Sequence, residues 1–259
     1  MAGALALLLV GGVVVVGPRI IQRLTPEPTF SPETPLAEQC DEVPRGAERI
    51  TVTADDGSLL GAALVGPANA TVGVVLRQGG SQTICEWLPW AGQVAEATGA
   101  RVLLFDRRGH GSSPGEGNLS AEPGDTLRAI DRLRHEGQHE VAMVASSMGN
   151  SIMFTTGPRV SPAPCAVASI SPVLTASDNN GALDATPLLG LPDNLWVTWE
   201  SEGTGVSANA RAIQRAALEQ RLPAPRTLPV DTSDHSLGLV NNHAEVREFL
   251  IEAISSCSG

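Results

Sequence analysis

Short apolar runs alternate along most of the chain with stretches in which apolar residues recur three and four positions apart. A short continuous apolar run is typical of a buried strand, and the three-and-four spacing is typical of one helix face. This alternation predicts an α/β fold, with a mainly parallel central sheet and helices on both faces. The predicted strands are 72–76, 101–105, 141–145, 166–170, 195–199 and 226–230, and the predicted helices are 87–98, one around 127–133, one from 148, 207–219 and one over 246–254.

Two further patterns show where the predicted domain begins and that it lacks a large insertion. The apolar runs 49–54 and 58–65 are joined by the turn sequence DDG, which predicts an N-terminal hairpin. Only residues 175–193 separate two of the predicted strands, which leaves no room for a large cap domain. We therefore expect one domain over 48–259.

The chain begins with a segment that is almost wholly apolar and about long enough to span a bilayer. We predict that residues 1–21 form an uncleaved membrane anchor, with a cleaved signal peptide or a buried helix as the alternatives. Arg19 and Arg23 flank the end that would leave the cytoplasm, which runs against the usual positive-inside tendency. Residues 22–47 are rich in Pro, Glu and Thr and predict an extended linker.

Charge and cysteine content narrow the possible partners and the compartment. The formal net charge of −11 argues against nucleic acid or an anionic membrane surface as a partner. The chain has four cysteines, and an even number after an export segment predicts disulfides in an extracytoplasmic domain, with buried free thiols as the alternative. No cysteine has CxxC spacing and no histidine lies close to one, so we expect no metal site.

The apolar run 141–145 ends abruptly in a serine that lies between a predicted strand and a predicted helix. Ala145 and Gly149, two positions either side of Ser147, are small enough for a crowded bend. This small-x-Ser-x-Gly stretch resembles the nucleophile elbow of the α/β-hydrolase family, with Ala145 in the place of the first glycine. The resemblance covers about residues 47–257 and implies that Ser147 is the nucleophile at a helix N-terminus. A serine that merely caps the helix is the alternative.

Two loops extend this resemblance. The stretch FDRRGHGSS, residues 105–113, is similar to the family loop D-x-R-G-x-G-x-S, and RQGGSQTICEW, residues 77–87, occupies the place of the oxyanion loop. Gln78 stands where the family usually has a histidine. The resemblance implies that the backbone N–H groups of Gly80 and Met148 bind the oxyanion. Since both donors are backbone groups, Gln78 is compatible with catalysis.

A serine hydroxyl needs a base, and the family order is nucleophile, acid, base. The resemblance assigns the base to His235, which lies between the last predicted strand and the last predicted helix. The remaining histidines are interpreted as surface or loop residues. They are His110, His135, His139 and His243.

The acid is assigned by matching the stretch VTWESEGTG to the family's G-x-x-Asp. With Trp199 in the place of the glycine, Glu202 takes the acid position. Glutamate can hold the imidazole as aspartate does. Glu200 and Asp178 are the alternatives, whereas Asp231 and Asp234, close to His235, are interpreted as turn residues.

The family fold also suggests a pairing of the cysteines. Cys40 and Cys85 are expected at the catalytic edge of the sheet, and Cys165 and Cys257 at the opposite edge. We therefore predict the disulfides 40–85 and 165–257, because any other pairing would have to span the sheet.

The resemblance implies a membrane-anchored or secreted serine hydrolase that cleaves small carboxylic esters or thioesters through an acyl-enzyme, without a cofactor. Ser147, His235 and Glu202 would form its triad. Lactonase, acyltransferase and peptidase activities use the same machinery, and fold does not choose among them. A non-catalytic exported scaffold used for binding is the alternative from another class, favoured by the departures at Ala145, Gln78 and Glu202.

Overall fold

The computed structural model describes residues 30–258 of the chain. The predicted anchor at 1–21 and the first part of the predicted linker, 22–29, lie outside the described residues. Between residues 30 and 258, no helix is both long enough and apolar enough to cross a membrane.

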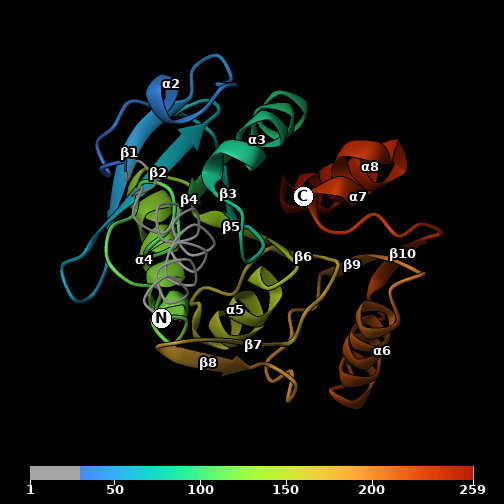
Figure 1. The fold of residues 1–259 in the computed structure, drawn as a ribbon. Coiled ribbons are helices and arrows are strands. Elements are labelled where there is room, and N and C mark those ends of the chain that lie inside the picture. The colour runs from blue at the N-terminus through green and yellow to red at the C-terminus, as the bar shows by residue number, and fades with distance from the viewer. Residues whose placement is uncertain (1–29, 259) are drawn as a thin grey trace, which may run out of the picture.

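Eight strands form one sheet in the order β1-β2-β4-β3-β5-β6-β9-β10 (Figure 1). β2 is antiparallel to β1 and β4, and every pairing from β4 to β10 is parallel. This confirms the predicted mainly parallel sheet with an N-terminal hairpin. The strands are β1 (Glu48–Thr53), β2 (Leu59–Val65), β3 (Val72–Arg77), β4 (Arg101–Phe105), β5 (Glu140–Ser146), β6 (Ala166–Ile170), β9 (Leu195–Glu200) and β10 (Arg226–Val230).

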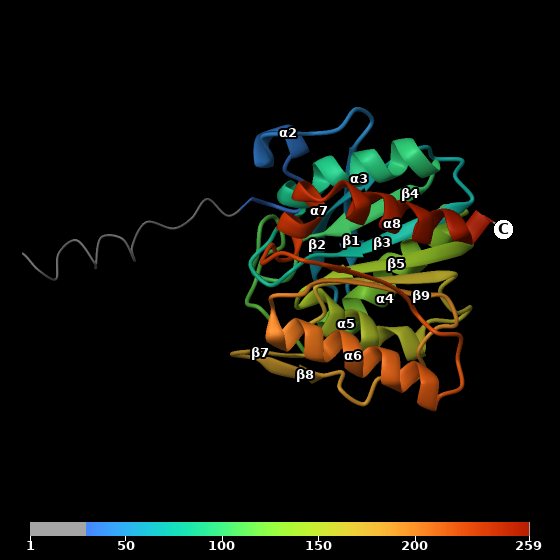
Figure 2. The ribbon, with the colours of Figure 1, turned by 90° about the vertical axis from the view of Figure 1, so that its right-hand side faces the viewer.

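Helices cover both faces of this sheet, as Figure 2 shows. α3 (Ile84–Thr98), α7 (Leu237–Asn242) and α8 (Ala244–Ser255) lie on one face, and α4 (Glu122–His135), α5 (Gly149–Thr156) and α6 (Thr204–Glu219) lie on the other. Two apolar clusters fill the spaces between the layers, one on each side of the sheet.

The alternation of side chains along β3 explains why residues 72–76 form a continuous apolar run. Val74 and Leu76 belong to the cluster under α3 and α8, whereas Val75 belongs to the cluster under α4. A strand buried on both faces favours apolar side chains on both, and the one charged residue of β3, Arg77 at its end, is paired with Glu122. The carboxyl ends of the parallel strands meet at one edge of the sheet, here called the carboxyl edge, and their amino ends meet at the amino edge.

Residues 30–47 differ from the predicted extended linker. They contain a short helix, α2 (Leu36–Gln39), and both Leu36 and Cys40 are buried in the core cluster beneath α3. The Arg49 guanidinium donates a hydrogen bond to the Thr34 carbonyl oxygen and fixes the segment further. A composition rich in Pro, Glu and Thr disfavours long regular elements, but one buried leucine and one disulfide are enough to hold this stretch against the domain.

The connection predicted to be too short for a cap domain forms a small hairpin. Its strands are β7 (Thr175–Asp178) and β8 (Gly181–Asp184), which pair with each other apart from the main sheet. Leu183 of the hairpin packs on Leu119 and Ile152. Two 3-10 turns, Gly157–Arg159 and Ser256–Ser258, complete the described elements.

One disulfide lies at each edge of the sheet. Cys40 is bonded to Cys85 in the first turn of α3, with 5.0 Å between the Cα atoms. Cys165 lies directly before β6 and is bonded to Cys257 after α8, with 5.3 Å between the Cα atoms. These are the two pairings expected from the sequence.

Candidate active site

A sharp turn joins β5 to α5 at Ser147. Its φ of 51° lies in the left-handed region, and its N–H donates to the Ile170 carbonyl oxygen at 3.0 Å. A methyl group at Gly149 would lie 2.4 Å from the Arg77 carbonyl oxygen, so only glycine fits there. Ala145, two positions ahead of Ser147, is fully buried. Backbone strain of this kind clusters at functional sites.

The loop after β10 brings His235 against Ser147. The His235 Nε2 atom lies 2.8 Å from the Ser147 Oγ atom, and its Nδ1 atom lies 2.5 Å from the Glu200 Oε1 atom. Glu200 is only 3% exposed, whereas 42% of the His235 side chain is exposed. Hydroxyl, imidazole and carboxylate thus form one hydrogen-bonded chain, which is suited to removing the serine proton.

The carboxylate in this chain is Glu200, and the prediction of Glu202 is corrected. Trp199 packs in the apolar cluster under α6, so strand alternation turns Glu200 to the other face, where the loop that carries His235 lies. β9 ends at Glu200, and Glu202 is an exposed residue in the following turn. Asp178, the other alternative, lies in the hairpin and accepts a hydrogen bond from the Leu119 N–H.

A further serine, Ser171, binds the carboxylate and is itself bound by Ser236, and the sequence singles out neither serine. The Ser171 hydroxyl donates to Glu200 Oε2 at 2.7 Å and accepts from the Ser236 N–H at 3.0 Å. Burial raises the pKa of the Glu200 carboxyl, but hydrogen bonds from His235 and Ser171 outweigh it and lower this pKa below its usual value. Glu200 is therefore ionised at neutral pH and can stabilise a charged imidazole.

The loop after β3 carries free backbone donors towards the same place. Within residues 30–258, the N–H groups of Gly80 and Met148 have no hydrogen-bond acceptor. A methyl group at Gly80 would lie 3.3 Å from the Met148 sulfur, so the two residues face each other. The Gln78 side chain is buried and donates to the Phe105 carbonyl oxygen at 2.7 Å, which holds the loop to β4. A methyl group at Gly79 would lie 3.3 Å from the Ser147 Cβ atom, so the loop that carries the Gly80 N–H lies next to the serine.

One amide oxygen connects this loop to the histidine loop. The Gln82 Oε1 atom accepts hydrogen bonds from the Gly79 N–H at 3.0 Å, the Trp87 Nε1–H at 2.9 Å and the Ser236 hydroxyl at 3.2 Å. The Ser236 hydroxyl also lies 2.8 Å from the Ser146 hydroxyl. These hydrogen bonds therefore join three segments next to Ser147 and His235. They are the turn after β5, the loop after β3 and the loop after β10.

Comparison with known proteins adds the family. The model of the alpha/beta hydrolase family matches residues 74–250. The chain belongs to this family. A search of curated proteins found no match.

Solved structures support the same fold for this hydrolase. A serine hydrolase without a lid from Xanthomonas campestris is 18% identical, with a TM-score of 0.59 over 82% of this chain and 94% of that one. An esterase from Pyrococcus furiosus is 12% identical, with a TM-score of 0.65 over 88% and 98% of the two chains. A putative aryl esterase from Burkholderia cenocepacia is 12% identical, with a TM-score of 0.60 over 82% and 99%.

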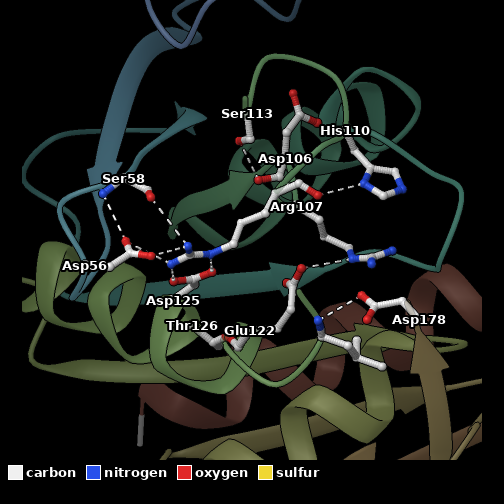
Figure 3. A network of polar contacts seen from close by, with 12 residues as sticks. Asp56, Ser58, Asp106, Arg107, His110, Ser113, Glu122, Asp125, Thr126 and Asp178 are labelled. Atoms are coloured by element: carbon white, nitrogen blue, oxygen red, sulfur yellow. Dashed lines mark hydrogen bonds and ion pairs between the residues drawn. The ribbon is translucent and has the colours of Figure 1, made fainter. Parts of the chain in front are cut away.

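The loop after β4 of this hydrolase is anchored by buried charges (Figure 3). The Asp106 carboxylate accepts hydrogen bonds from the Ile84 N–H and the Ser112 N–H, each at 2.8 Å, and so joins the loop to the first turn of α3. A methyl group at Gly111, whose φ is 50°, would lie 2.3 Å from that carboxylate. The family sequence D-x-R-G-x-G-x-S therefore has a structural role here.

The other histidines of the hydrolase do not contact Ser147. His110 Nδ1 lies 3.0 Å from the Arg108 carbonyl oxygen, and His243 Nε2 lies 3.0 Å from Asp234 Oδ2. Hydrogen bonds from Asn242 and His243 lower the pKa of Asp234. In the described part of the chain, no group of His, Cys, Asp and Glu side chains is close enough to hold a metal ion.

Proposed function

We propose that this hydrolase cleaves carboxylic esters through an acyl-enzyme on Ser147, with His235 as the base and Glu200 as the acid. The observation that carries the proposal is the hydrogen-bonded chain from Ser147 Oγ through His235 to Glu200, at 2.8 Å and 2.5 Å. A serine helix cap would require neither contact.

The geometry supports the following sequence of steps. Ser147 Oγ attacks the ester carbonyl carbon while His235 Nε2 accepts the hydroxyl proton. The oxygen that becomes negative is stabilised by the N–H groups of Gly80 and Met148. His235 then gives the proton to the departing alcohol, and a water activated by the same imidazole releases the acid. Glu200 keeps the Nδ1 proton in place and stabilises the imidazolium.

The substrate is proposed to be a small ester that reaches an open site. His235 is substantially exposed, and the only described elements between β6 and β9 are the hairpin strands β7 and β8. Esterase names among the similar structures favour an ester, and thioesters use the same steps. Two disulfides favour an oxidising compartment, in keeping with a domain that residues 1–21 anchor outside the cytoplasm.

Labelling with a fluorophosphonate tests the proposal most directly. The probe should label the folded wild-type protein and not Ser147→Ala, and p-nitrophenyl esters of increasing acyl length should define the acyl preference. A folded wild-type protein that neither labels nor hydrolyses any ester would reject catalysis in favour of the scaffold alternative. Labelling that persists in Ser147→Ala would reject the nucleophile.

A further inference from the structure

A buried arginine contacts the loop that carries the proposed oxyanion donor. The Arg107 Nη1 group donates to the Gly80 carbonyl oxygen at 2.5 Å, and its Nε group donates to Glu122 Oε1 at 3.1 Å. The Arg107 side chain is 4% exposed and the Glu122 side chain is fully buried. Figure 3 shows Arg107 extending from the loop after β4 toward Glu122 of α4. The Arg107 guanidinium thus binds the Gly80 carbonyl and is itself bound by Glu122 of α4.

Glu122 is shared with a second arginine, which lies directly ahead of the loop. Arg77 is the last residue of β3, directly ahead of the loop, and its Nη2 group donates to Glu122 Oε2. Its guanidinium carbon lies 4.1 Å from the centre of the Phe105 ring. Its Nε and Nη1 groups have no hydrogen-bond partner among the described residues. Two buried guanidinium groups therefore share the Glu122 carboxylate at the base of the loop.

We propose that Arg107 is a positioning residue of the oxyanion loop, which restrains Gly80, and with it the Gly80 N–H, through the Gly80 carbonyl. The proposal rests on the proposed function. The Gly80 carbonyl belongs to the peptide group that follows the Gly80 N–H, so a charge-assisted hydrogen bond to it fixes the chain on one side of the Gly80 Cα atom. Gly80 has the freest backbone torsions of any residue and no side chain that could restrain them otherwise. A preorganised donor stabilises the transition state more than the ground state, so the effect of Arg107 should fall on kcat rather than on KM.

The neighbouring residue provides a matched control. Arg108 is also buried, and it forms a two-point pair with Asp125 of α4, with both distances 2.8 Å. A further contact joins it to Asp56, and Figure 3 shows Asp56 and Asp125 on the side of the loop away from Asp178. Arg108 makes no recorded contact with Gly80. Replacing either arginine by methionine removes one buried guanidinium and leaves one α4 carboxylate short of a partner, but only Arg107→Met releases the oxyanion loop.

The kinetic test compares Arg107→Met with Arg108→Met. For Arg107→Met we expect kcat to fall about 10- to 100-fold, below the loss for deleting an oxyanion donor outright, with KM changed less than about threefold. The affinity for a trifluoromethyl ketone, which forms a tetrahedral adduct, should fall by a similar factor. Arg108→Met should keep kcat and this affinity within about twofold, even if it unfolds at a similarly reduced temperature. Equal kinetic losses in the two variants would overturn the proposal.

A second measurement does not depend on turnover. The Ser81 nitrogen belongs to the same peptide group as the Gly80 carbonyl, so its ¹⁵N chemical shift should change in Arg107→Met and stay constant in Arg108→Met. If Arg107→Met does not fold, Arg107→Lys replaces it, because a single ammonium group cannot reproduce both guanidinium contacts. An unchanged Ser81 shift in the folded Arg107 variant would reject the positioning role. Absence of ester hydrolysis and labelling in the wild type would instead reject the proposed function.

Discussion

The carboxyl edge and the amino edge of the sheet are built from different kinds of contacts, although each is closed by a disulfide. At the carboxyl edge three serines, Ser147, Ser171 and Ser236, have a positive φ, and their polar atoms all belong to the network around Glu200 and His235. The amino edge combines hydrogen bonds, among them those of Asn194 with the Cys165 carbonyl oxygen and the Trp196 Nε1–H, with aromatic packing. There the Trp196 ring lies 5.0 Å from the Phe249 ring and 4.4 Å from the Arg226 guanidinium carbon.

This difference suggests that the residues needed for activity and those needed for stability lie at different edges of the sheet. A left-handed backbone at a residue other than glycine costs roughly 1–3 kcal/mol and persists only where the surroundings determine it. The Ser236 hydroxyl contacts both Gln82 and Ser146, and its N–H binds Ser171, so the strained backbone is fixed by neighbours from three other elements. Changes at the carboxyl edge should therefore affect activity, and changes at the amino edge should affect stability.

The largest expected effect comes from the proposed nucleophile and base. Ser147→Ala and His235→Ala should each lower ester turnover by about 10⁴-fold or more, because attack and proton transfer fail together. The double variant should be little worse than either single variant. The unfolding temperature should be nearly unchanged, since Ser147 is only partly buried and His235 is substantially exposed. Ester kinetics with thermal unfolding as the control measure both, and a residual activity above about 1% would contradict the assigned roles.

The next effect separates two glutamates that are two positions apart. Glu200→Gln keeps the shape of the side chain but allows the wrong imidazole tautomer, so kcat should fall by about 10³- to 10⁴-fold. Glu202→Gln changes an exposed residue and should stay within about twofold of wild type. Measuring kcat/KM for both variants at one pH decides the assignment. A larger loss in Glu202→Gln would show that the carboxylate next to His235 is not the one used.

The error over the acid shows what sequence can and cannot predict here. The strands were predicted well because burial on both faces leaves a continuous apolar run, as in β4 and β6. Ser147 directly follows β5 and His235 lies in the loop after β10, where the resemblance expects them, and the structure brings their side chains within 2.8 Å. Glu200 and Glu202 have the same strand parity, so only the end of β9 distinguishes them, and strand ends are weakly encoded.

The positioning residues were missed for a different reason. Ser171 contacts Glu200, and Gln82 contacts Ser236, across separations of 29 and 154 residues. No local period or spacing encodes such contacts, because they exist only after the sheet has formed. The same holds for the Arg107 contact with Gly80.

A smaller, graded effect is expected from pH. Hydrogen bonds lower the pKa of Glu200, so this carboxylate stays charged where histidines gain their second proton. A protonated imidazole cannot accept the Ser147 proton. Because the reaction needs this imidazole as a base, we expect kcat/KM to fall with a one-proton slope as the solution is acidified. A rate that is flat down to pH 5 would argue against His235 as the base.

The lowered pKa of Glu200 also has a consequence for stability. A carboxyl whose pKa is lower in the folded protein than in the unfolded chain stabilises the fold above the unfolded value, and this contribution is lost as the pH falls through the folded value. Glu200→Gln should therefore reduce the free energy of unfolding at neutral pH, and the gap to wild type should close below about pH 4. Urea unfolding at both pH values measures this, and a gap that does not depend on pH would contradict the sign.

The smallest expected effect on activity comes from removing the disulfide at one edge of the sheet and comparing the result with removal of the disulfide at the other edge. The closed loops span 45 residues for Cys40–Cys85 and 92 residues for Cys165–Cys257, and in the chain-entropy model each bond contributes about 4 kcal/mol. Replacing both cysteines of either pair by serine should therefore lower the unfolding temperature by a similar amount, about 10 °C.

Activity should respond to only one of these disulfides. Cys85 adjoins Ile84, whose N–H binds Asp106, and Gln39 beside Cys40 donates to the same carboxylate, so the first bond holds the start of α3 next to the oxyanion loop. The variant that lacks Cys40–Cys85 should lose roughly 2- to 10-fold in kcat at 15 °C, where it remains folded. The variant that lacks Cys165–Cys257 should keep its kcat, because that bond closes the amino edge. Equal kcat losses at equal folded fractions would mean that the two edges are not separable, and the comparison between them would fail.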